Sequence, residues 1–123
     1  MDVQTFTPDD TVAAIIGKFR SDLGEHTGPF GLLVQFRVHD GAESQVRQRF
    51  GEAQGPTLRD SGCMAFEMSR HATDCRRFFV HERWISLAAL DAHLRTPHAS
   101  TLRDAFNQFI DGLPEFSVLI PID

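Results

Sequence analysis

The chain has 123 residues, of which 41% are hydrophobic and 24% are charged, and its net charge at pH 7 is −5. This length suits one compact domain. With a single lysine and an acidic balance, the chain lacks the basic surface by which nucleic-acid binders follow phosphates. No apolar run approaches the roughly 20 residues of a membrane span, and the acidic start differs from an export signal, so a cytoplasmic protein is expected.

Residues 1–29 are predicted to form a helical extension that precedes a domain of residues 30–123. Asp9 and Asp10 are good capping residues, and apolar side chains then repeat at helical spacing as far as Leu23. Gly24 is a natural helix stop. The apolar stripe must be buried against the body of the domain or against a partner chain, and both alternatives are open.

From residue 30 the hydrophobic period changes to that of a β-strand, and a strand is predicted over residues 30–38. A helix is expected over residues 42–58, with a break or kink near Gly55 because Gly55 and Pro56 both disfavour helix. Two further strands are predicted over residues 62–70 and 76–84, and the short connection HATDC between them indicates a hairpin.

Ser86 is predicted to cap the next helix, which ends at Thr96 and Pro97. Another helix follows at once and is expected to stop at Gly112, and the last strand is expected over residues 115–121. The order from residue 30 is strand, helix, strand, strand, helix pair, strand. It predicts a ferredoxin-like α+β fold, a split βαβ with a four-stranded antiparallel sheet and helices on one face.

The predicted strands carry apolar side chains on both faces. Opposite faces hold Leu33 and Phe36, Ala65 and Phe66, and Phe79 and Phe78. A sheet that is apolar on both faces needs a second cover, and the simplest is another copy of the chain. We therefore expect a homodimer joined through its sheet faces.

Together these features resemble the antibiotic biosynthesis monooxygenase family of the dimeric α+β barrel group, over about residues 30–123. The resemblance rests on HDG after the first strand, on GCMAFEMSR, on the E-x-W formed by Glu82 and Trp84, on SLAALDAHL and on TPH. It implies a dimeric α+β barrel that acts on a small molecule. Similar proteins include quinol and anthrone oxygenases that use dioxygen with neither metal nor flavin, enzymes that isomerise or process small signalling molecules, and haem-degrading enzymes.

Departures from the better-defined members narrow this chemistry. Positions at which haem-degrading members carry tryptophan, histidine and asparagine correspond here to His93, Arg103 and Val34. Haem degradation is therefore disfavoured. The anthrone oxygenases rely partly on tyrosines, and this chain contains none. An anthrone substrate is thus in question for this chain. Arg37 and Arg70 are among the remaining polar groups that could contact a substrate.

His93 is the candidate general base, because a histidine with an ordinary pKa of about 6.5 exchanges protons near neutral pH. On its helix it lies about 60° from Leu90 around the axis, at the border of the apolar face. This position predicts that His93 looks into a cavity between helix and sheet. The alternative is a histidine at the flank of the helix that is hydrogen-bonded to backbone.

A substrate pocket is predicted around the E-x-W motif. Glu82 and Trp84 share one strand face, and a buried Glu82 needs a partner, so it either supports the fold or exchanges protons. Trp84 is interpreted as pocket wall or core. Phe66 and Met68 are predicted to line the same cavity, with plain core packing as the alternative, and Arg70 is assigned to the pocket as a polar group.

Neither the histidines nor the cysteines predict a metal site. His93 and His98 are five residues apart with a proline between them, and His81 points away from Glu82. His98 is predicted at the start of the following helix, near the pocket. Cys63 and Cys75 are too few for a disulfide framework, lack zinc-site spacing and are predicted to be free thiols.

Three hypotheses follow for the function. The first is a cofactor-independent oxygenase acting on a small aromatic or quinol-like metabolite, with His93 as base. The second is a related isomerase or lyase that uses the same pocket without dioxygen. The third is a non-enzymatic dimeric binding module. An apolar cavity beside His93 favours the first hypothesis, a polar cavity with converging arginines favours the second, and a filled interior favours the third.

Overall fold

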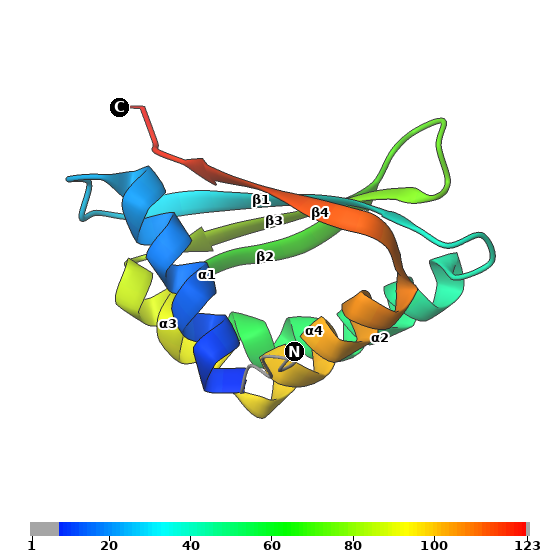
Figure 1. Ribbon diagram of the computed structural model, residues 1–123, viewed down its shortest axis with the longest axis horizontal. Helices are drawn as coiled ribbons and strands as arrows, with labels where there is room; N and C mark the ends of the chain where they lie inside the picture. The colour runs from blue at the N-terminus through cyan, green and yellow to red at the C-terminus, as the bar shows by residue number, and fades with distance from the viewer. Residues whose placement is uncertain (1–7, 123) are drawn as a thin grey trace, which may run out of the picture.

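The structure, a computed structural model, describes residues 8–122, with side chains from residue 10 onward. In this part of the chain an antiparallel sheet of order β2-β3-β1-β4 carries helices on one face (Figure 1). The elements are α1 (Pro8–Leu23), β1 (Phe30–Val38), α2 (Glu43–Leu58), β2 (Cys63–Arg70), β3 (Arg77–Trp84), α3 (Leu87–Leu94), α4 (Pro97–Phe109) and β4 (Ile110–Leu119). The predicted ferredoxin-like α+β architecture is confirmed.

The register of the two central strands aligns their buried side chains. Strands β1 and β3 place Phe36 opposite Phe78 and Val34 opposite Val80, and these four side chains are buried under the helices. Because side chains alternate along a strand, the same register carries Glu82 onto the helix-covered face. The hairpin of β2 and β3 thereby delivers the E-x-W motif to the interior.

Local signals set most helix ends where the sequence predicts them. Gly24 follows α1 with φ of 59°, a left-handed conformation that glycine adopts without a side-chain clash. The Ser86 hydroxyl accepts a hydrogen bond from the backbone N–H of Ala89 at 3.2 Å and caps α3. The Thr96 hydroxyl caps α4 in the same way, accepting from the Ala99 N–H at 3.2 Å.

Two details differ from the prediction. Helix α2 ends at Leu58 as predicted, but it continues through Gly55 and Pro56 without the expected break. Pro56 lies in the last turn, where its missing N–H costs a single intrahelical bond. Strand β4 begins at Ile110, five residues earlier than expected, and Gly112 lies within it with φ of 84°. Gly112 therefore belongs to an irregular strand segment, where the pairing with β1 shifts register, and does not end a helix.

The N-terminal helix shares the core of the domain. Its buried side chains, Val12, Ile16, Phe19 and Leu23, belong to the same hydrophobic cluster as the strands. In Figure 1 α1 crosses in front of the sheet, and it packs against α3 and β4. The apolar stripe of this helix is thus buried against its own chain.

The helix-free face of the sheet is more polar than the sequence predicts. Leu33, Phe79 and Leu119 do lie on this face, but they alternate with polar residues such as His81 and Arg83. Met64, counted among the apolar strand residues, is exposed on the edge strand β2. The sheet is therefore not uniformly apolar on both faces. The expected dimer interface would have to use the smaller apolar area formed by Leu33, Phe79 and Leu119.

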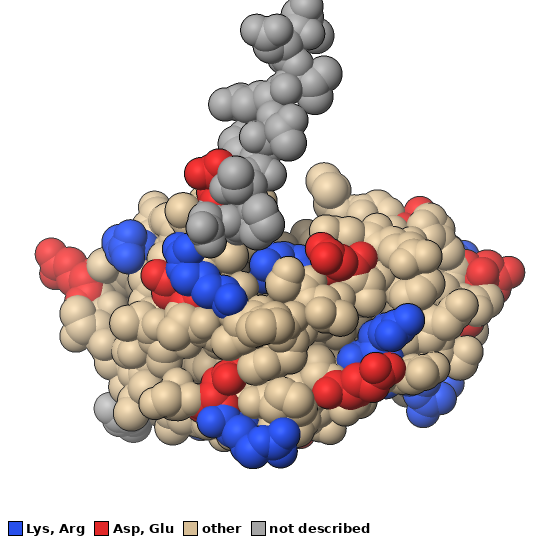
Figure 2. Space-filling model, turned by 90° about the horizontal axis from the view of Figure 1, so that it is seen from below, with Lys and Arg blue, Asp and Glu red and all other residues tan. Residues whose placement is uncertain are grey.

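Other features of the described residues bear on the excluded functions. Seen from the helix side, acidic and basic side chains are interspersed, without a basic patch (Figure 2). Among residues 8–122 no helix is both long and apolar enough to cross a bilayer. Cys63 and Cys75 are both free, as predicted, with Cys63 half-buried and Cys75 exposed.

Candidate active site

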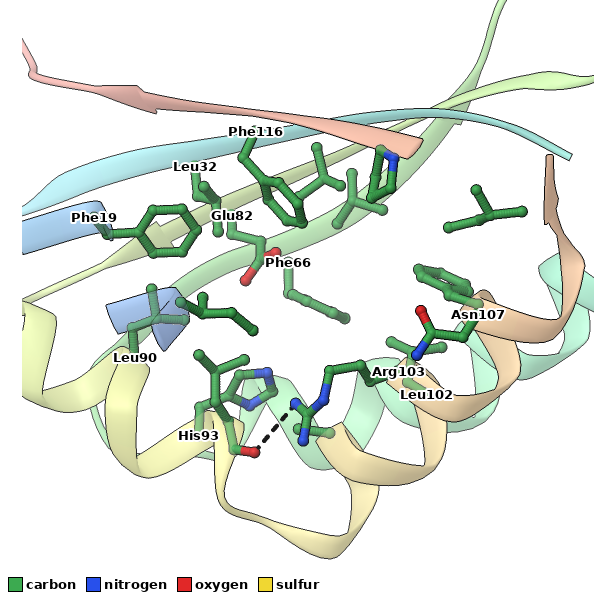
Figure 3. A pocket seen from close by; sticks show the side chains of 18 residues that line it. Phe19, Leu32, Phe66, Glu82, Leu90, His93, Leu102, Arg103, Asn107 and Phe116 are labelled. Atoms are coloured by element: carbon green, nitrogen blue, oxygen red, sulfur yellow. Dashed lines mark hydrogen bonds between the residues drawn. The ribbon is translucent and has the colours of Figure 1, made fainter. Parts of the chain in front are cut away.

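A cavity of about 140 Å³ lies between the sheet and the helices (Figure 3). Carbon atoms form most of its wall. The sheet contributes side chains such as Leu32, Phe66 and Phe116, and helices α1, α3 and α4 supply the remaining sides. The polar side chains that reach it are Glu82, His93, Arg103 and Asn107. An apolar cavity with a few convergent polar groups is the usual form of a small-molecule site.

His93 reaches this cavity from α3 and is only 5% exposed. Its Nδ1 lies 2.7 Å from Oδ2 of Asp60, and its Nε2 has no hydrogen-bond partner among the described residues. Burial holds the pKa of His93 below its ordinary value, although the bond to Asp60 acts in the opposite direction. A neutral imidazole that donates from Nδ1 to Asp60 leaves the Nε2 lone pair free, which is the arrangement of a general base.

Asp60 lies in the turn between α2 and β2 and also accepts a hydrogen bond from Nε2 of His98, at 2.7 Å. Burial works to raise the pKa of Asp60, but the hydrogen bonds from His93 and His98 outweigh it, so the pKa lies below the usual value. The turn depends on Gly62, whose φ is 84°. A Cβ at this position would lie 2.6 Å from Cβ of Ala89 on α3.

The atoms that meet at Asp60 are also a donor set that transition metals accept. Oδ2 of Asp60, Nδ1 of His93 and Nε2 of His98 all lie within 4.8 Å of one another. Two imidazoles and one carboxylate bind iron and zinc in many proteins. The five-residue spacing of His93 and His98 argues against a shared site, but the turn before α4 brings both rings to the same carboxylate.

The E-x-W motif forms an internal hydrogen bond. Nε1 of Trp84 donates to Oε1 of Glu82 at 3.0 Å, and both side chains are buried. Burial raises the pKa of Glu82 to about 7, against the lowering effect of that bond. The fully buried Trp84 ring packs on His93 with centroids 4.7 Å apart. The motif therefore supplies both the partner that Glu82 needs and a rigid support for the imidazole.

Arg103 is a cavity residue that the sequence did not single out for this role. It extends from α4, and its Nη1 donates to the backbone oxygen of Leu94 at 3.3 Å, the dashed line in Figure 3. Among the described residues the guanidinium makes no other hydrogen bond, and most of its donors are therefore available to a ligand. The charge of Arg103 also helps to keep the pKa of His93 low.

Comparison with known proteins decides the family. The model of the family described as antibiotic biosynthesis monooxygenase matches residues 29–105. The chain belongs to this antibiotic biosynthesis monooxygenase family. The predicted resemblance is thus confirmed, and α1 lies outside the matched region.

Individual members of the antibiotic biosynthesis monooxygenase family show how far the likeness extends. A Mycobacterium tuberculosis protein named "Putative monooxygenase Rv0793" is 27% identical over 97 residues, which are 79% of this chain and 95% of the relative. Its solved structure superposes with a TM-score of 0.72 at 25% identity, covering 77% of this chain and 96% of that one. PA3566 of Pseudomonas aeruginosa has the same TM-score at 18% identity, covering 81% and 100%, and shows a shared fold.

Within this family member the structure brings together some of the predicted site residues and separates others. Glu82, His93 and Phe66 line the cavity. Trp84 lies behind His93 and does not reach the cavity wall. His98, 24% exposed on its side chain, lies on the outer side of Asp60 at the start of α4.

The remaining polar and apolar candidates lie elsewhere. Met68 packs against the core without lining the cavity, and Arg70 is exposed at the end of β2. Arg37 pairs with Asp74 at 2.9 Å in the loop after β2. The only arginine that lines the cavity among the described residues is therefore Arg103.

Proposed function

We propose that this protein is a cofactor-independent monooxygenase that acts on a small aromatic or quinol-like metabolite. The observation that carries the proposal is the free Nε2 of His93 in an apolar cavity, with Asp60 bonded to the opposite ring nitrogen. This arrangement fixes the tautomer of His93 and presents a neutral base to a bound hydroxyl group. Membership of the monooxygenase family supports the reaction class.

The first chemical step is a proton transfer. Nε2 of His93 removes the proton of the substrate hydroxyl, while the Asp60 carboxylate stabilises the imidazolium that forms. Arg103 lines the same cavity and stabilises the negative charge that develops on the substrate oxygen. The surrounding carbon wall strengthens both electrostatic effects because it excludes water.

The oxygen chemistry then belongs to the substrate anion. The electron-rich ring reacts with dioxygen at a carbon that carries hydrogen, and a C–O bond to a peroxide forms. Glu82, whose pKa of about 7 keeps part of it protonated at neutral pH, supplies a proton as the O–O bond breaks. The peroxide takes up the proton held by His93, and the ring carbon then gives its own hydrogen as a proton to the Glu82 carboxylate as the new carbonyl forms. One oxygen atom stays in this carbonyl and the other leaves as water, so a phenol and one dioxygen give a quinone and one water, with no other reductant.

The two alternative functions receive less support. Converging arginines would favour an isomerase or lyase, but Arg103 is the only arginine among the lining residues that the structure describes. A binding module with a filled interior would leave no cavity beside His93. The apolar cavity and its single cation therefore support the oxygenase.

Oxygen uptake by metal-free protein tests the proposal. Hydroquinones and naphthols are supplied as substrates to the wild type, to His93→Gln and to the control His39→Gln, which alters an exposed histidine outside the cavity. We expect uptake at one dioxygen per substrate, about 100-fold slower in His93→Gln and unchanged in the control. If the wild type takes up oxygen no faster than buffer alone with every substrate, the proposed monooxygenase activity is refuted.

A further inference from the structure

We infer that helix α1 is the specificity-determining wall of the cavity, and that it fits an uncharged aromatic hydroxyl compound of one or two fused rings. The inference deepens the proposed function, since it names the class of substrate for the same site. Helix α1 lies outside the region that matches the family, yet Ile15 and Phe19 of this helix line the cavity. Without α1 this side of the cavity would lose Ile15 and Phe19 and keep only side chains of β4 such as Phe116.

The contact that closes this side joins α1 to the last strand. The rings of Phe19 and Phe116 lie 5.9 Å apart at an interplanar angle of 55°, a favourable tilted pair. Phe19 is 2% exposed, whereas Phe116 is 40% exposed at the edge of the sheet. In Figure 3 these two rings lie on the side of the cavity opposite His93 and Arg103. A ligand whose hydroxyl reaches His93 therefore places its apolar ring against Phe19 and Phe116.

The charged groups of the cavity select an uncharged ligand. Arg103 disfavours a permanent cation, and Glu82, ionised in part at neutral pH, disfavours a permanent anion. A ligand whose hydroxyl group is neutral in solution is repelled by neither Arg103 nor Glu82, and it loses its proton only beside His93. Aromatic rings of the wall supply the remaining contact.

The volume of the cavity limits the size of the ring system. An apolar cavity of about 150 Å³ accommodates benzene, and this one measures about 140 Å³ with an open side. One ring fits inside, and a second fused ring extends toward the opening. A three-ring system would have to displace Phe19, so the side chain of residue 19 sets the upper limit.

Binding measured without turnover tests this inference. Affinities of phenol, 2-naphthol and 2-hydroxyanthracene are measured under anaerobic conditions on the full-length wild type and on Phe19→Ala. We expect the wild type to prefer 2-naphthol to 2-hydroxyanthracene, and Phe19→Ala to shift the ratio of the two affinities about tenfold toward the three-ring compound. The control is Leu23→Ala, which removes another buried side chain of α1 that does not line the cavity, and its ratio should not change.

A second variant keeps the test decisive where Phe19→Ala fails to fold. Ile15 is only half-buried, and Ile15→Phe adds volume to the cavity wall, so 2-naphthol should bind about tenfold more weakly. The inference is overturned if the wild type binds none of the three compounds, or if variants that line the cavity and the Leu23→Ala control behave alike. This binding experiment consumes no oxygen and is therefore independent of the oxygen-uptake assay. If the size selection is observed but the wild type takes up no oxygen, the proposed monooxygenase activity fails and the proposed role of α1 is retained.

Discussion

Nδ1 of His93 lies 2.7 Å from Oδ2 of Asp60, and the two residues are 33 positions apart in the chain. The same oxygen accepts a hydrogen bond from His98, so the carboxylate holds two imidazoles at once. Trp84 packs on the face of the His93 ring, and the ring therefore has little freedom to turn. The proposed base is therefore oriented before any substrate arrives.

Replacing Asp60 by Asn should slow oxygen uptake by about 100-fold, because Asn carries no charge and does not fix the tautomer of His93. The nitrogen chemical shifts of the His93 ring should show a mixture of tautomers in the variant and one tautomer in the wild type. Asp91→Asn, which alters a surface ion pair with Arg95, is the matched control and should keep full activity. Equal rates for Asp60→Asn and the control would contradict the orienting role.

Glu82 should make the protein less stable as the pH rises. Its folded pKa of about 7 lies above the ordinary 4.5, so the folded state binds more protons than the unfolded state between these values. The free energy of unfolding should fall from about pH 4.5 to about pH 7, by up to about 3 kcal/mol. In Glu82→Gln this component disappears, and the difference in stability between variant and wild type should grow with pH.

Chemical denaturation at pH 5 and pH 8 measures this difference. The control Glu67→Gln changes an exposed glutamate on the neighbouring strand and should follow the wild type at both values. A pH profile of Glu82→Gln parallel to that of the wild type would show that Glu82 is not the titrating group.

The turn at Gly62 should not tolerate a side chain. Gly62→Ala combines a φ of 84° with a Cβ 2.6 Å from Cβ of Ala89, and should lower the free energy of unfolding by about 3 kcal/mol. The control is Gly51→Ala in α2, where a Cβ meets nothing within 4 Å, and it should stabilise the protein by about 0.5–1 kcal/mol. Comparable melting temperatures for the two variants would refute the predicted strain.

Removal of divalent metals should leave both stability and oxygen uptake unchanged. The two distances of 2.7 Å around Oδ2 of Asp60 are hydrogen-bond lengths, and the N–H groups of His93 and His98 satisfy this oxygen without a cation. Protein dialysed against EDTA is compared with untreated protein in thermal melting and oxygen uptake. A stoichiometric metal detected in the untreated protein, together with a loss of melting temperature after EDTA, would show that these donors hold an ion.

The chain should form a homodimer through the open face of the sheet. Phe79 and Leu119 are diagonal neighbours of Leu33 in the strand register, and together they form an apolar centre on this face. Light scattering should give twice the chain mass of 13.8 kDa for the wild type and one chain mass for Leu33→Asp. Gln108→Asp, exposed on α4, should stay dimeric. A monomeric wild type at micromolar concentration would refute the interface.

The elements could be predicted from the sequence because local chemistry decides them. Ser86 and Gly24 act within a few residues of their own positions, and the apolar periods report the buried faces directly. The predicted start of β4 was wrong because glycine is common both after helices and in irregular strands, and Gly112 was assigned to the first case. Only the pairing of β4 with β1 separates these two uses of glycine.

The site was harder to predict because its parts meet only in the folded chain. Asp60 is a turn residue without periodicity, and nothing near it in the sequence indicates that His93 and His98 will bind its carboxylate. Arg103 carries no motif, and its place follows from the packing of α4 over the sheet. The direction of His93 was accessible from helical spacing alone, since this spacing already placed it at the border of an apolar face.

The pairing of Phe19 with Phe116 joins side chains from near the two ends of the described chain. During synthesis, α1 leaves the ribosome first but finds this partner only after β4 has emerged. A contact of such long sequence separation forms late, because the intervening loop must close before the contact contributes energy. We therefore expect the nascent chain to bring His93 beside Asp60 before Phe19 meets Phe116, so that this side of the cavity closes only after β4 has emerged.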